Sequence, residues 1–153
     1  MREIECGFAS LTQGSGVDLL IRYGPTVAVQ VGFDREYRSG SGDIPNLHEA
    51  QHLALVDTGA TLSCIDSTLA ATLRLPIVDR ESVSGVHGSQ EVNVHLAQIY
   101  VPSLDWVIFG RFHGVHLVRG NQPHLALLGR IFLRDFTMTY DGRTGSVRIS
   151  KIE

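Results

Sequence analysis

The chain has 153 residues, about the length of a single domain, and its 43% hydrophobic and 19% charged residues are typical of a folded globular protein. A formal net charge of -3, without any run of Lys or Arg, excludes the usual electrostatic basis for binding nucleic acid. No apolar stretch reaches the roughly 18–20 residues of a membrane span, and two cysteines are too few for a disulfide framework, so the sequence predicts a cytoplasmic protein with no membrane contact.

Residues 1–24 are interpreted as an N-terminal extension whose role the sequence leaves open, and residues 25–153 as a single domain. Within the extension, Val17–Tyr23 is rich in apolar residues and predicts an extra strand. Cys6 lies near the chain terminus and is expected to be an exposed thiol, whereas Cys64 is expected to be a small buried residue.

Alternating apolar and polar residues predict half-buried strands along most of the domain. This pattern occurs at residues 27–31, 92–96, 136–140 and 147–149, and the turn sequence Asp-Gly-Arg-Thr-Gly at 141–145 predicts a hairpin between the last two strands. Two continuous apolar runs, Leu53–Val56 and Leu125–Leu128, predict strands that are buried on both faces. The polar, glycine-rich residues 34–51 predict a loop.

Only two segments favour a helix. Residues 66–73 begin with Asp66, whose carboxylate can cap the helix, and they end before Pro76. Residues 130–135 follow Gly129 and can form one short helix. The chain is therefore expected to be all-β, with many short strands and one or two short helices.

One acidic residue stands where a buried strand ends. Asp57 follows the apolar run Leu53–Val56 and is itself followed by Thr58 and Gly59. A buried, unpaired carboxylate is costly, so it either caps a turn or serves a chemical step. A single carboxylate cannot act as base and acid together in amide hydrolysis, whereas two facing carboxylates that share a proton can. Because Asp-Thr-Gly occurs once in the chain, the second carboxylate would come from a second copy in a twofold-symmetric homodimer.

The segment around Asp57 resembles the active-site segment of the retropepsin-like aspartic proteases, which are single-lobed relatives of pepsin. Four further segments resemble this family in the same order along the chain: the strand before the catalytic one (25–32), the flap hairpin (83–92), the second hydrophobic-hydrophobic-Gly signature (125–133) and the terminal strand (146–150). The resemblance implies a closed, barrel-like β-fold and an aspartic endopeptidase that acts as a homodimer on extended peptides, without a metal or another cofactor.

The same resemblance implies roles for individual residues. Asp57 would be the catalytic carboxylate. The hydroxyl of Thr58 would bind Thr58 of the second copy across the dimer axis, and the backbone N–H of Gly59 would keep the two carboxylates coplanar. Ala60, Gly85, Val86, His87 and Gly88 would contact substrate, while Leu128, Gly129 and Arg130 would support the site. Since Ala60 offers no hydroxyl to the carboxylate, the optimum is expected to be less acidic than that of the gastric enzymes.

Other interpretations of these residues remain open. Asp57-Thr-Gly can be a plain turn, the dimer can be a peptide-binding or scaffold module without turnover, or the enzyme can be a processing protease for one partner. The histidine pairs at 48/52 and 113/116 lack a third ligand, so no metal site is expected. His87 is either a solvated turn residue or a pH-sensitive flap contact. Arg130 is expected to tie its helix to a neighbouring carboxylate.

Overall fold

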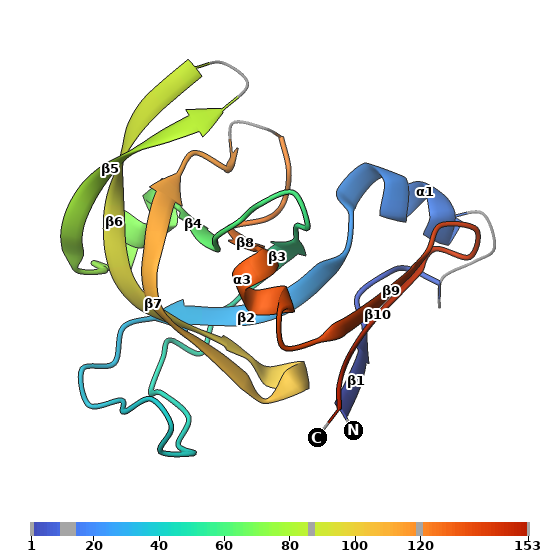
Figure 1. Ribbon diagram of the computed structural model, residues 1–153, viewed down its shortest axis with the longest axis horizontal. Coiled ribbons are helices and arrows are strands. Elements are labelled where there is room, and N and C mark those ends of the chain that lie inside the picture. The colour runs from blue at the N-terminus through green and yellow to red at the C-terminus, as the bar shows by residue number, and fades with distance from the viewer. Residues whose placement is uncertain (1, 10–14, 86–87, 119–120, 153) are drawn as a thin grey trace.

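The computed structural model describes residues 2–9, 15–85, 88–118 and 121–152, and these residues fold mainly into strands (Figure 1). The strands are β1 (Arg2–Glu5), β2 (Thr26–Gly32), β3 (Gln51–Val56), β4 (Cys64–Asp66), β5 (Ile77–Gly85), β6 (Gly88–Val101), β7 (Trp106–Val115), β8 (Ala126–Leu128), β9 (Thr137–Asp141) and β10 (Ser146–Lys151). The helices are α1 (Ser15–Tyr23), α2 (Ser67–Thr72), α3 (Arg130–Leu133) and the 3-10 helix η1 (Pro102–Leu104). The predicted all-β class is confirmed.

Seven strands form a sheet that closes on itself. Their order is β2-β3-β8-β4-β7-β6-β5. Because β2 also pairs with β6, a closed ring is formed by β2, β3, β8, β4, β7 and β6. The barrel-like closure expected from the sequence is therefore present. Within this ring, β3 lies between β2, to which it is antiparallel, and β8, to which it is parallel. Strand β5 remains outside the ring and forms a long hairpin with β6 that projects from the body of the molecule (Figure 1).

The remaining strands form a three-stranded antiparallel sheet at the end of the molecule where both chain termini lie (Figure 1). Its order is β1-β10-β9, so a strand of the N-terminal extension pairs with the last strand of the chain. The hairpin predicted at 141–145 connects β9 to β10, and Gly145 N–H donates to Asp141 O. The division of the chain at residue 24 stays a prediction.

The extension differs from the sequence prediction in two ways. Residues 17–23 lie in helix α1 rather than in a strand, which raises the number of α-helices above the one or two expected. The helix buries Gly16 and Leu20 on one face and leaves Ile21 76% exposed, which is helical rather than alternating spacing. Asp18 in the first turn and Arg22 in the last complement the helix dipole.

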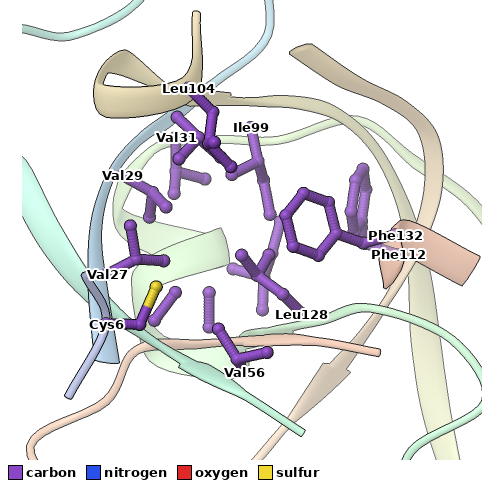
Figure 2. Close-up of a cluster of buried hydrophobic side chains, with 14 of the residues drawn as sticks. Cys6, Val27, Val29, Val31, Val56, Ile99, Leu104, Phe112, Leu128 and Phe132 are labelled. Atoms are coloured by element: carbon purple, nitrogen blue, oxygen red, sulfur yellow. The ribbon is translucent and has the colours of Figure 1, made fainter. Parts of the chain in front are cut away.

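The second difference is Cys6, which is 1% exposed instead of being a free surface thiol. Its side chain points into the main hydrophobic cluster beside Val27 and Val56 (Figure 2). This burial follows from two backbone hydrogen bonds, Cys6 N–H to Val147 O and Thr26 N–H to Cys6 O, which hold the residue between the two sheets. Cys64 is only half-buried. The extension therefore contributes to the same core as the rest of the chain.

The core shows that the two continuous apolar runs are buried on one face only. Ala54, Val56, Ala126 and Leu128 are at most 3% exposed. On the opposite face of β3, Leu53 is 42% exposed and Leu55 is half-buried, which corrects the prediction that these strands are buried on both faces. The prediction failed because a continuous apolar run does not reveal which face a neighbouring sheet or helix covers.

Both helices predicted from the sequence are confirmed. Helix α2 begins after Asp66, whose Oδ2 accepts hydrogen bonds from the N–H groups of Thr68 (3.1 Å) and Leu69 (3.2 Å). Helix α3 is a single turn that follows Gly129, as expected. No helix or strand occurs between Gly32 and Gln51, so the loop predicted there is also confirmed.

Candidate active site

Asp57 lies directly after the end of β3, and the backbone on both sides of it is fixed. Val56 N–H donates to Pro25 O and Asp57 N–H donates to Leu128 O, each at 2.9 Å. The strand thus continues its pairing with both neighbours up to the acidic residue. The Asp57 side chain is half-buried, and its Oδ1 accepts a hydrogen bond of 2.8 Å from Gly59 N–H. A carboxylate held in this way keeps one orientation.

The loop after Asp57 is anchored to the segment that carries α3. Arg130 N–H donates to Ala60 O at 2.8 Å, and Ile131 N–H donates to Thr61 O at 3.1 Å. Gly129 N–H donates to the buried Ser63 hydroxyl at 3.2 Å. These contacts join residues that are about seventy positions apart in the sequence, so the two segments form one unit around Asp57.

Gly129 is the point of closest approach between these segments. A Cβ atom at this position would lie 2.6 Å from Leu62 O and 2.8 Å from Ala60 O. Both contacts are with backbone atoms, which cannot turn aside as a flexible side chain would. Only a residue without a side chain therefore permits this close approach of the two segments.

Arg130 anchors the loop through its side chain as well. Its guanidinium donates from Nη1 to Thr58 O at 2.7 Å and from Nη2 to Thr61 Oγ1 at 2.9 Å. The expected partner was a carboxylate, and that prediction is wrong. The loop presents outward-facing carbonyl and hydroxyl oxygens to Arg130, and the planar fork of the guanidinium satisfies two of them at once.

Asp57 borders an open cavity of about 550 Å³ that is otherwise mainly apolar. Leu55 and Pro25 line it from the strand side, and Met138 and Tyr140 line it from β9. Thr58 also lines the cavity. Both Thr58 and Gly59 are exposed. Asp57 is thus the one acidic residue among the described residues that line this cavity.

The negative charge of Asp57 affects the pKa of the Cys64 thiol. Burial, and secondarily the negative charge of Asp57, raise the pKa of Cys64 to about 11. The Cys64 thiol therefore stays protonated at neutral pH and does not compete with the carboxylate for a proton or a metal ion. Among the residues that the structure describes, no group of three or more His, Cys, Asp or Glu could hold a metal ion.

The flap predicted from the sequence corresponds to the hairpin of β5 and β6. Its strands remain paired up to Gly85 and Gly88. A Cβ atom at Gly88 would have no described neighbour within 4 Å, whereas one at Gly85 would lie 3.9 Å from Gly88 O. Val86 and His87, also predicted to contact substrate, lie outside the described residues. The end of the hairpin lines a cavity of about 420 Å³ together with Val115 from β7.

Asp66 cannot supply a second catalytic carboxylate within the chain. It is 2% exposed, and its Oδ1 accepts a hydrogen bond from Leu117 N–H at 3.1 Å while Oδ2 caps α2. Both oxygens of this carboxylate thus accept hydrogen bonds from backbone N–H groups. The sequence interpretation of Asp66 as a helix cap is confirmed.

Sequence reasoning missed Thr61 and Ser63, whose hydroxyls fix the loop to Arg130 and Gly129. Their hydrogen-bond partners are 69 and 66 residues away in the sequence, and no local sequence pattern predicts hydrogen bonds over such a separation. It also missed His124, which is 1% exposed and whose Nε2 lies 2.8 Å from the Thr26 hydroxyl. The sequence showed His124 only as one of seven histidines.

Comparison with known proteins gives a limited result. No protein-family model matches the sequence, and no curated protein matches it. Among solved structures, the chain is similar to the Simian Foamy Virus (mac) protease, with a TM-score of 0.43 and 13% identity over 71% of this chain and 91% of that one. It is also similar to the EIAV protease bound to the inhibitor HBY-793, with a TM-score of 0.46 and 21% identity over 72% of this chain and 86% of that one. At these values the similarities say nothing about the activity of this chain.

No helix in the described parts of the chain is long and apolar enough to cross a membrane.

Proposed function

We propose that this chain is an aspartic endopeptidase that acts as a homodimer, with one Asp57 from each copy. The observation that carries the proposal is the fixed carboxylate itself. Asp57 ends a core strand, accepts a hydrogen bond from Gly59 N–H at 2.8 Å and borders an open apolar cavity. The loop that holds it is fixed to α3 by backbone and side-chain hydrogen bonds.

A second copy is needed because one carboxylate cannot act as base and acid in the same step. The neighbouring Asp66 is fully engaged in capping, and the chain contains one Asp-Thr-Gly. Thr58 and Gly59 are exposed in the single chain, and Leu62 and Tyr140 are 44% and 53% exposed. A twofold contact over this loop would cover these residues and bring the two carboxylates together.

The two carboxylates would then divide the work of hydrolysis. One ionised oxygen removes a proton from a water molecule, whose oxygen attacks the carbonyl carbon of the scissile peptide bond. The protonated carboxyl of the other Asp57 donates its proton to the carbonyl oxygen, which gives a tetrahedral gem-diol. The proton taken from water then passes to the peptide nitrogen, the C–N bond breaks, and one hydroxyl proton of the gem-diol returns to a carboxylate, which leaves a carboxylic acid and a free amine. Because water is the nucleophile, no bond forms between enzyme and substrate. The β5–β6 hairpin would close over an extended peptide, and its backbone would pair with that of the substrate.

The decisive test is a mixing experiment with the isosteric variant Asp57→Asn. Wild-type protein at fixed concentration is mixed and equilibrated with the variant, and cleavage of a peptide library is followed from about pH 3 to 8. If each active site needs two Asp57 residues, equal mixing lowers wild-type activity to about one half, and a ninefold excess of the variant lowers it to about one tenth. If one chain suffices, the added variant changes nothing.

Asp43→Asn is the matched control, because it removes an exposed carboxylate from the loop at 34–51. Mixing with this variant should leave peptide cleavage per wild-type chain undiminished. A dimer that binds peptides without cutting them would instead be a peptide-binding module. A dimer that ignores the library but cuts one protein partner would be a specialised processing protease.

A further inference from the structure

The β5–β6 hairpin consists of a supported base and a free-standing end (Figure 1). Strand β6 pairs with β7 only from Val94 to Val101, whereas it pairs with β5 as far as Gly88. Residues 80–85 of β5 and 88–93 of β6 therefore have no third strand beside them in the described parts of the sheet. We call this two-stranded end the ribbon. A two-stranded unit is marginally stable by itself, so the position of the ribbon depends on its junction with β7.

The backbone is irregular at this junction. The pairing of β5 with β6 shifts between Ile77 and Asp79, which leaves Val78 as an extra residue. A bulge of this kind bends the strand and increases its twist. The last pair between β6 and β7, Val94 with His113, lies beside Asp79. The bend and the end of the support by β7 therefore coincide, and the ribbon can pivot at this point.

Four charged or ionisable side chains connect β5 to β7 across the junction, and we call them the latch: Asp79, Glu81, Arg111 and His113. Arg111 Nη2 donates to Asp79 Oδ2 at 2.7 Å and lies 3.5 Å from Glu81 Oε1. His113 Nε2 donates to Glu81 Oε2 at 2.6 Å. Because neighbouring strands lie about 5 Å apart, these contacts span roughly 10 Å over the intervening β6.

The latch crosses a buried apolar part of β6. Val92 is opposite Glu81 and Val94 is opposite Asp79, and the two valines are 8% and 1% exposed. The His113 side chain is 15% exposed, so its hydrogen bond to Glu81 is partly shielded from water. Shielding makes this contact stronger than the usual ion pair on an open surface.

The cavity of about 420 Å³ at the end of the hairpin lies on the same face of the sheet as the latch. Val83 follows Glu81 by two residues and Val115 follows His113 by two residues, and both line this cavity. One wall therefore belongs to the ribbon and another to β7. The ribbon is about 20 Å long from Asp79 to Gly85, so a change of about 15° in strand twist at the junction moves its end by about 5 Å.

We propose that the latch fixes the angle between the ribbon and β7, and thereby controls how far the hairpin closes over a bound peptide. Glu81 is the central positioning residue, because its carboxylate contacts both Arg111 and His113. It acts on the site through the hairpin and not at the reacting atoms. The effect on cleavage rests on the proposed function, whereas the angle of the ribbon can be measured without it.

The test is a distance measurement between spin labels attached through Ser84→Cys in the ribbon and Gln51→Cys at the start of β3, two exposed positions. The labelled chain is diluted with an excess of the unlabelled chain, so that only distances within one chain contribute. With the latch intact we expect one narrow distance distribution. Glu81→Thr keeps a residue suited to a strand but is too short to reach β7, and it should broaden the distribution by about 5 Å.

The matched control is Glu91→Thr, which removes the 3.3 Å ion pair with Arg80 that joins β5 to β6 inside the ribbon. This variant should keep the narrow distribution. His113→Thr should broaden it, and the double variant with Glu81→Thr should be no broader than Glu81→Thr alone, because both changes remove the same hydrogen bond. A narrow distribution in a folded Glu81→Thr protein, equal broadening by Glu91→Thr, or additive broadening in the double variant would overturn the proposal.

Peptide cleavage tests the consequence for the active site. If loss of the latch lowers the closed fraction of the hairpin to about one fifth, Glu81→Thr should raise KM about fivefold and leave kcat unchanged. A wild-type KM in a variant with a broadened distribution would refute control of closure by the latch. Absence of cleavage by every protein, the wild type included, would contradict the proposed function instead, and the distance measurement would still decide whether the latch holds the ribbon.

Discussion

The variant Gly129→Ala tests whether the loop that carries Asp57 is held in place by its contact with the α3 segment. The added Cβ would lie 2.6 Å from Leu62 O and 2.8 Å from Ala60 O, and neither backbone atom can move alone. Overpacking of this kind costs about 1–3 kcal/mol, which corresponds to a decrease in Tm of roughly 3–10 °C for a chain of this size. Since the displaced loop carries the carboxylate, a shift of ~1 Å should reduce kcat about 100-fold.

The matched control is Gly142→Ala in the β9–β10 turn. There the added Cβ would meet only the Tyr140 side chain at 3.5 Å, which is an ordinary contact. Thermal unfolding and peptide cleavage are measured for both variants and the wild type. We expect Gly142→Ala to match the wild type in both. If Gly129→Ala also had the Tm and kcat of the control, the close approach would not position the loop and the reasoning would be refuted.

Three further predictions concern other residues of this region and the buried polar groups. Arg130→Lys cannot donate to both Thr58 O and Thr61 Oγ1, so peptide cleavage should fall about tenfold, whereas the exposed control Arg134→Lys should cleave normally. Burial lowers the pKa of His124, so the unfolded chain takes up the proton first and the stabilisation from neutral His124 is lost as pH falls below about 6.5. Urea unfolding at about pH 7.5 and 5.5 should therefore show a smaller loss of stability for His124→Gln than for the wild type, and an equal loss would contradict this assignment. Burial raises the pKa of Cys6 to about 12 and that of Cys64 to about 11, so a thiol reagent at about pH 8 should label both only after denaturation, and rapid labelling of the folded protein would show that one is accessible.

Much of the fold could be predicted because its signals are local. The period-two alternation of Val27, Val29 and Val31 is sufficient to identify β2, and the turn sequence at 141–145 identifies the β9–β10 hairpin. Asp66 likewise predicts the start of α2, because N-terminal capping of a helix depends on only a few neighbouring residues. These elements depend little on what packs against them.

The predictions failed where distant residues decide the outcome. The run Leu19-Leu20-Ile21 gives no clear period, and the helical form becomes evident only when Leu20 is buried and Ile21 is exposed. Cys6 is buried because β1 pairs with β10 at the other end of the chain. The partners of Arg130 could not be identified either, since the loop oxygens that it binds are presented only in the folded chain.

The candidate site combines both kinds of information. The position of Asp57 is local, because it follows from the end of β3, but its rigidity depends on pairing with β8 and on the contacts of Gly129 and Arg130. Under the proposed function, a chain that fixes this carboxylate so closely, yet leaves Thr58 and Gly59 exposed, supplies one side of a site. A carboxylate used only to cap a turn would need neither the apolar cavity nor the second segment beneath the loop. The arrangement therefore favours a half-site that a second copy completes over a simple structural turn.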